Sequence, residues 1–151
     1  QLAQAIPGAC SRIEPPALDE SLERSDDAHR AALDAAYARL TTARTLEEGT
    51  DAHLHFHETL LDRCPSVWTK RVIGVLAEHA QRYVLLGAQR FRSGRGPAAE
   101  HERLRDAALA GDVGRAVVTL EEHLRGTLDS VRAALAARAS ESDRPDGSVP
   151  K

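Results

Sequence analysis

Apolar residues recur at helical spacing through almost the whole chain. The i, i+3, i+4 pattern gathers them on one side of a helix, whereas no stretch alternates apolar and polar residues over the length of a strand. β-branched residues, which favour strands, are sparse. The pattern predicts an all-α chain, and a length of 151 residues fits one domain with one core.

Turn and capping residues divide this pattern into six helices. Pro15 and Pro16 suit the first turn of a short helix, and Ser25-Asp26-Asp27 suits the cap of the second. The glycine-rich segment 93–97 and the Ala110-Gly111-Asp112 turn separate the last three helices. The predicted helices span residues 17–24, 28–44, from 45 or 50 to 64, 67–91, 98–109 and 113–138.

The predicted folded domain covers residues 10–138. Residues 1–9 are interpreted as a leader or linker, and residues 139–151, which are polar and poor in apolar side chains, as a disordered tail. The chain begins at Gln1 and contains no Met, so we expect a fragment of a longer protein. Inward rows are predicted in the second helix at Ala28, Ala32, Ala35, Ala36 and Leu40, and in the fourth at Val72, Leu76, Tyr83 and Leu86.

Composition excludes several classes of function. The chain has 23 acidic and 20 basic residues without a basic cluster, which argues against nucleic-acid binding by this chain alone. Cys10 and Cys64 are too few for a disulfide framework and lack CxxC spacing, which indicates a reducing compartment. No apolar run approaches the ~18 residues of a membrane span and no signal peptide is evident, so we expect a cytoplasmic protein.

Three of the seven histidines lie between positions 53 and 57. His53 and His57 are one helical turn apart on an apolar stripe, while His55 points elsewhere. Two inward imidazoles at this spacing are either half of a metal site or two core histidines with hydrogen-bond partners, and taken alone the second case is the commoner. The rest of the stripe is Phe56, Leu60, Leu61 and Cys64.

Two later helices also direct a histidine inward. Neutral imidazole is the commonest protein ligand for metals, and a metal site takes three or four such groups. Periodicity does not show that the helices converge, so separately hydrogen-bonded core histidines remain the alternative. His79 lies near an inward row and competes for the site, whereas His29 and His55 are predicted at the surface. The two rows are Ala98, His101, Leu104 and Ala108, and Ala116, Leu120, His123, Thr127 and Val131.

Several short motifs follow one another along roughly residues 10 to 135. They are Arg12-Ile-Glu14-Pro15-x-Ala17, Phe56-His57-x-x-Leu60, Cys64-Pro65-Ser66, Glu100-His101-x-x-Leu104, Ala107-x-x-Ala110-Gly111-Asp112, Ala116 and His123-Leu124. Each is short, but their order and spacing together resemble the FCD domain, the effector-binding domain of FadR-type GntR transcription regulators.

The resemblance implies an antiparallel bundle of six to seven helices around a central cavity that holds a divalent metal and a small organic acid. In that family an Asp-x-x-x-His pair and one histidine from each of two later helices hold the metal. The matching positions here are His53, His57, His101 and His123, so His53 stands where the family has aspartate. A ligand set of four imidazoles would favour Zn²⁺, then Ni²⁺ or another transition metal, over Mg²⁺ or Mn²⁺. Arg12 matches a first-helix position that can contact the effector's carboxylate.

The resemblance also implies a function. Such regulators carry a winged-helix DNA-binding domain before this one, and residues 1–151 contain no such segment. The expected function is therefore that of a non-enzymatic sensor, which binds a small carboxylate or sugar acid and controls DNA binding by the other domain of a homodimeric regulator.

Two other functions remain open on the residues alone. A helical metal-dependent hydrolase would use the same histidines to activate water, but Glu58 and Glu100 project about 100° away from the neighbouring ligands and no general base is evident. The second alternative is a helical interaction module in which the histidines only pack.

Overall fold

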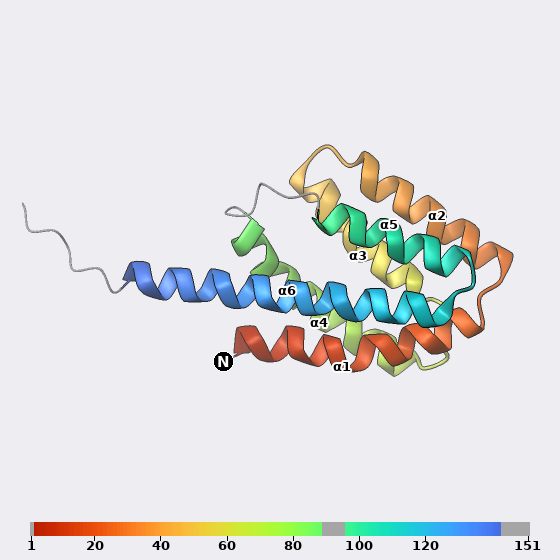
Figure 1. Cartoon of the computed structure of the whole chain (residues 1–151), viewed down its shortest axis with the longest axis horizontal. Coiled ribbons are helices and arrows are strands. Elements are labelled where there is room, and N and C mark those ends of the chain that lie inside the picture. Colours follow the sequence, from red (N-terminus) through yellow and green to blue (C-terminus); the bar gives the residue numbers. More distant parts are fainter. Residues whose placement is uncertain (1, 89–95, 143–151) are drawn as a thin grey trace, which may run out of the picture.

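The computed structural model describes residues 2–88 and 96–142, which form a bundle of six helices (Figure 1). No strand occurs in these residues, which confirms the all-α prediction. Helix α6 runs antiparallel to α1, and α2 runs antiparallel to both α3 and α5. None of the described helices is long and apolar enough to cross a membrane. The helices are α1 (Leu2–Glu23), α2 (Asp27–Thr42), α3 (Leu46–Leu60), α4 (Val67–Ala88), α5 (Gly96–Leu109) and α6 (Val113–Ser142).

Helix α1 is much longer than predicted, because it begins at Leu2 and not at residue 17. Residues 2–9, predicted as a leader or linker, form its first turns. Pro15 and Pro16 lie inside the helix, where a proline lacks the backbone donor and costs about 3 kcal/mol. Packing of α1 on α4 and α6 offsets this loss by burying one continuous row. The row consists of Cys10, Glu14, Ala17, Leu18 and Ser21.

Capping residues explain the starts of two other helices. The Thr45 hydroxyl accepts a hydrogen bond from the Glu48 backbone N–H, and the Glu48 carboxylate accepts one from the Thr45 N–H. This capping box fixes the start of α3 near residue 45, the earlier of the two predicted positions. Asp26 caps α2 by accepting from the His29 backbone N–H.

Of the later helix ends, that of α5 agrees with the prediction and that of α6 does not. Gly111 has φ +70°, a left-handed conformation that ends α5 where the sequence predicted a turn. Helix α6 continues to Ser142, so residues 139–142, predicted as the start of a disordered tail, are helical. The predicted end of the fourth helix at residue 91, most of the break at 93–97 and the rest of the tail lie outside the described residues.

The buried face of α2 differs from the predicted row. Its buried residues are His29, Leu33 and Ala36, and three of the alanines in the predicted row are exposed. Because α2 carries alanine on several sides, its apolar period does not single out one face. The surface prediction for His29 is therefore wrong: its Nε2–H donates to the Thr59 carbonyl (2.7 Å), and its Nδ1 accepts from the Ser25 hydroxyl (3.0 Å).

The buried face of α4 also differs from the predicted row. Ile73 is buried, whereas Val72, predicted to face inward, is 50% exposed. Leu76 is half-buried, and the side chains of Tyr83 and Leu86 lie outside the described residues. Helix α4 packs mainly on α1 and α6 and only lightly on α3. This packing leaves space between α3 and α4.

Two contacts fix α3 in the bundle. The Ser21 hydroxyl of α1 donates to the Leu60 carbonyl at the end of α3 (2.8 Å) and accepts from the Arg63 backbone N–H (3.1 Å). Phe56 is fully buried, and its ring contacts those of His57 and His101. The centre of the core therefore lies directly against the histidines.

Candidate metal centre and adjoining cavity

Four histidines from three helices converge in the bundle: His53 and His57 from α3, His101 from α5 and His123 from α6. One ring nitrogen of each lies within 4.8 Å of the corresponding nitrogen of the others. His57 Nε2 and His101 Nε2 are 3.3 Å apart. Two ligands of a tetrahedral zinc ion with Zn–N bonds of about 2.05 Å are separated by about 3.3 Å. The donor set and its spacing therefore fit a metal of this class.

The tautomer of His123 leaves one nitrogen available to a metal. Its Nδ1–H donates to the Glu100 carboxylate (2.9 Å), and this hydrogen bond lowers the pKa of Glu100. Nε2 of His123 then keeps its lone pair for the cluster. A carboxylate behind the distal nitrogen is the usual way in which a metal-binding histidine is oriented.

His53 and His57 are held in the neutral form. Burial, reinforced by the neighbouring His101 and His123, lowers the pKa of His53 to about 3. Burial also lowers the pKa of His57 well below its usual value, and the neighbouring His53 adds to this effect. Nδ1 of His53 is buried without a hydrogen-bond partner among the described residues. An unpartnered polar atom in a packed core is costly, and a bound metal would satisfy it.

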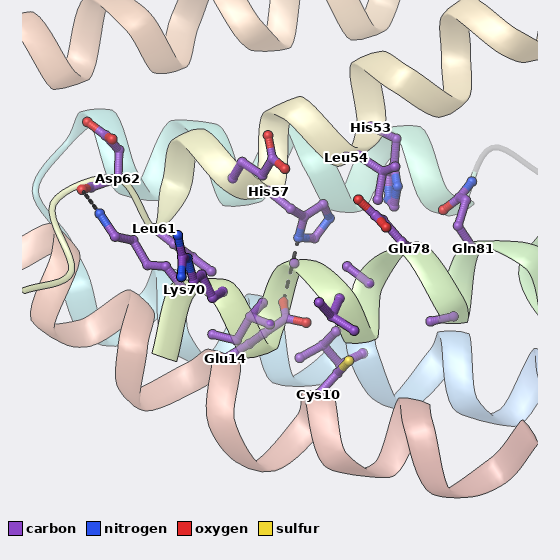
Figure 2. A pocket seen from close by; sticks show the side chains of 18 of the residues that line it. Cys10, Glu14, His53, Leu54, His57, Leu61, Asp62, Lys70, Glu78 and Gln81 are labelled. Carbon is purple, nitrogen blue, oxygen red and sulfur yellow. Dashed lines mark hydrogen bonds and ion pairs between the residues drawn. The ribbon is translucent and has the colours of Figure 1, made fainter. Parts of the chain in front are cut away.

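Glu14 brings a second carboxylate to the cluster from α1. Its Oε2 lies 3.8 Å from Nδ1 of His57 (Figure 2), whereas Nε2 of the same ring faces His101. Glu14 is 4% exposed, and burial raises its pKa to about 7. Burial and the adjacent Glu14 also raise the pKa of the Cys10 thiol to about 12. At 3.8 Å the Glu14 carboxylate lies near the His57 ring but beyond hydrogen-bond distance, whereas Glu100 hydrogen-bonds His123.

A cavity of about 530 Å³ opens beside His53 and His57, between α3 and α4, with α1 and α6 contributing to its walls (Figure 2). Its volume is within the range of ~300–1,000 Å³ that holds small-molecule ligands. Glu14, Glu58, Asp62 and Glu78 line it together with Lys70 and Arg71.

The structure brings together all four histidines that were predicted as metal ligands, and it separates them from the others. His79 and His55 are exposed. Arg12 is also exposed and is not among the residues that line the cavity, so the structure does not bring it to the histidines.

Sequence reasoning missed Glu14 and the role of Glu100 as partners of the histidines. Glu14 falls on the buried row of α1, a signal that becomes visible only when that helix is extended past residue 10. Glu100 does point away from the neighbouring His101, but the partner that it meets is His123 on another helix.

Comparisons with known proteins agree with this architecture. The FCD domain family matches residues 9–126. The chain belongs to the FCD domain family. It is 33% identical over 129 residues to the uncharacterized HTH-type transcriptional regulator BphR of Paraburkholderia xenovorans (strain LB400), a match that covers 80% of this chain and 53% of that protein. This FCD chain therefore spans about half the length of the curated relative.

The fold is similar to that of a transcriptional regulator, a GntR family member from Pseudomonas syringae pv. tomato str. DC3000. The TM-score is 0.82 at 18% identity, and the match covers 93% of this chain and 59% of that one. The helical-bundle prediction is thereby confirmed.

Proposed function

We propose that this FCD domain is the ligand-sensing part of a GntR-type transcription regulator, and that it binds a divalent metal through His53, His57, His101 and His123. The observation that carries the proposal is the convergence of four ring nitrogens from three helices within 4.8 Å. Core histidines that only packed would each need a separate hydrogen-bond partner, as His29 has in Ser25 and Thr59.

Zinc suits this donor set best. Imidazole is a ligand of borderline softness that favours Zn²⁺, Ni²⁺ and Cu²⁺ over hard ions, and the four proposed ligands include no carboxylate. A bound ion would supply a Lewis-acidic centre for an anionic ligand. Burial keeps His53 and His57 neutral, and Glu100 orients His123 through its hydrogen bond.

A small carboxylate or sugar acid is the proposed effector, and it binds in the cavity beside His53 and His57. Among the charged side chains that line the cavity, four are acidic and two are basic, so the lining itself does not favour an anion. The attraction for the effector's carboxylate would therefore come from the metal. Arg12 was predicted to contact this carboxylate and remains to be tested, although its exposed side chain gives no support.

The proposed output is control of a winged-helix DNA-binding domain in a homodimeric regulator. A ligand can shift such an equilibrium only if it binds one arrangement of the bundle more tightly than the other. The cavity between α3 and α4 suits this role because α4 packs only lightly on α3. Closing these helices on an effector would move α4 relative to the rest of the domain.

Metal analysis of the purified chain tests the proposal. The protein is stripped with a chelator, titrated with Zn²⁺ in a calorimeter, and compared with His101→Gln and with His55→Gln, which changes an exposed histidine outside the cluster. We expect one Zn²⁺ per chain in wild type and His55→Gln, and at least about tenfold weaker binding in His101→Gln. Absence of stoichiometric binding in wild type, or unchanged affinity in His101→Gln, would overturn the metal assignment.

A thermal-shift screen then tests effector binding. A ligand at about 100 times its Kd that binds only the native state stabilises it by ~2.7 kcal/mol. We expect carboxylates to raise the Tm of zinc-loaded protein and to leave stripped protein unchanged. An equal shift in both forms would show that the acid does not bind at the metal, and a lower response of Arg12→Ala would establish a role for Arg12.

A further inference from the structure

The walls of the cavity beside the histidines are mostly apolar. Leu54 and Leu61 of the α3 region, Ile73 of α4 and Leu124 of α6 contribute large apolar side chains. Apart from the Cys10 thiol and the imidazoles of His53 and His57, the neutral hydrogen-bonding side chains among its described lining residues are Gln81 and Thr127. A ligand with many hydroxyl groups would lose their hydration here and regain few hydrogen bonds.

Small residues on α4 keep this space open. Gly74, Ala77 and Ala80 line the cavity, and no heavy atom outside the helical turn lies within 4 Å of the position that a Cβ would take at Gly74 among the described residues. Gly74 has no positive φ that would require glycine. Glycine inside a helix costs about 1 kcal/mol relative to alanine. Neither the backbone conformation nor close packing requires glycine at position 74, whereas a ligand in the cavity would need the room.

The charges along the walls leave room for one anionic group. Glu78 lies on the histidine side, where a second carboxylate of the ligand would meet like charge, and Glu14 is buried there as well. Lys70 lies towards the other end of the cavity, and its Nζ already donates to the Asp62 carbonyl (2.9 Å; Figure 2). Arg71, the other basic residue of the lining, lies with its guanidinium over the Trp68 ring. On the histidine side, the position that can receive an anion is therefore the metal itself.

From these observations we infer that the cavity selects monocarboxylates with an apolar body, such as an alkyl chain or an aromatic ring, over sugar acids and short dicarboxylates. The carboxylate binds at the metal beside His53 and His57, and the apolar body lies against Leu54, Ile73 and the open face at Gly74. This inference rests on the proposed metal site and narrows the class of effector that the site accepts.

Calorimetry on zinc-loaded full-length chain tests the inference with sodium salts of straight-chain acids from acetate to octanoate, with benzoate, and with gluconate and succinate for comparison. Burial of each added methylene should tighten binding about fourfold until the cavity is filled. Gluconate and succinate should bind at least about tenfold more weakly than hexanoate. This advantage of hexanoate comes from burial of its alkyl chain, and it would be lost if the chain stayed in water.

Gly74→Leu provides the matched variant. A Cβ at this position meets no heavy atom within 4 Å, and a leucine side chain on this wall should occupy cavity volume, so zinc affinity and acetate binding should be unchanged while the gain from longer chains is lost. Gly114→Leu is the control, because Gly114 is an exposed helical glycine that also has nothing within 4 Å of a Cβ and lies outside the cavity lining.

The possible outcomes separate the two proposals. If zinc binds but gluconate binds as well as hexanoate, or Gly74→Leu keeps the chain-length dependence, the apolar-body inference is wrong and the sensor proposal stands. If zinc fails to bind, the metal site itself is wrong. Zinc binding without binding of any acid would overturn this inference and the effector part of the proposed function together.

Discussion

Neutrality of His53 makes the stability of the metal-free protein depend on pH in a calculable way. The folded-state pKa of about 3 lies below the usual value of 6.5 because the ring is buried beside other histidines. The unfolded chain therefore binds a proton that the folded chain excludes. The contribution of His53 is fully present above pH 6.5 and is lost as the pH falls from 6.5 towards 3.

The magnitude follows from these two pKa values. Between pH 7.5 and pH 5, exclusion of one proton from a group with an unfolded pKa of 6.5 lowers the free energy of unfolding by roughly 2 kcal/mol. Glu14 acts in the opposite direction, because its raised pKa of about 7 means that the folded protein takes up a proton over the same range. A single pH titration of wild type would mix these effects with that of His57, whose pKa is also lowered.

Comparison with His53→Gln isolates the histidine, because Glu14 is present in both proteins. Urea unfolding of chelator-treated protein, followed by circular dichroism at pH 7.5 and pH 5, should show that wild type loses about 2 kcal/mol more than His53→Gln. His55→Gln, which changes an exposed histidine on the same helix, should behave as wild type. Equal losses in wild type and His53→Gln would refute the assignment of a buried neutral imidazole at this position.

Three further predictions test the surroundings of the site. His53→Ala should weaken Zn²⁺ binding by at least about tenfold, while His53→Asp should retain a metal site that shifts towards Mn²⁺, both measured by competition titration. Glu100→Gln should weaken Zn²⁺ binding by about 10–100-fold through loss of the carboxylate behind His123, whereas Glu102→Gln, an exposed neighbour, should not. Ser21→Ala should lower the free energy of unfolding by about 1–3 kcal/mol, measured by urea titration, because the Arg63 N–H and the Leu60 carbonyl lose a partner.

Apolar periodicity in helices that carry large side chains was sufficient to predict the helical content and the inward direction of the four histidines, whereas their convergence on one site was implied only by the family resemblance. Of the described residues in the rows through His101 and His123, all are buried as predicted except Thr127, which is half-buried. In α2, where alanine occupies several faces, the same reasoning chose the wrong side and placed His29 at the surface. Periodicity orients a helix only when one face is clearly more apolar than the others.

The errors in α1 have a different physical origin. Local rules stop a helix before Pro15 and Pro16, but tertiary burial of the row from Cys10 to Ser21 outweighs the loss of two backbone hydrogen bonds. That burial depends on α4 and α6, which are distant in sequence. The cavity was equally invisible to sequence periodicity, because it depends on how far α3 and α4 stand apart.

Replacement of a carboxylate ligand by His53 changes where negative charge lies around the proposed ion. Four neutral imidazoles leave the charge of a divalent ion unbalanced within the ligand set, but Glu100 and Glu14 lie behind His123 and His57. A carboxylate in this outer position strengthens the basicity of the imidazole that it contacts without becoming a ligand itself. The arrangement would thus favour metals that prefer nitrogen, while the ion retains enough positive charge to attract one effector carboxylate. Because Glu78 also lines the cavity, a second carboxylate on the effector would be repelled, and an apolar body is the remaining way to gain affinity.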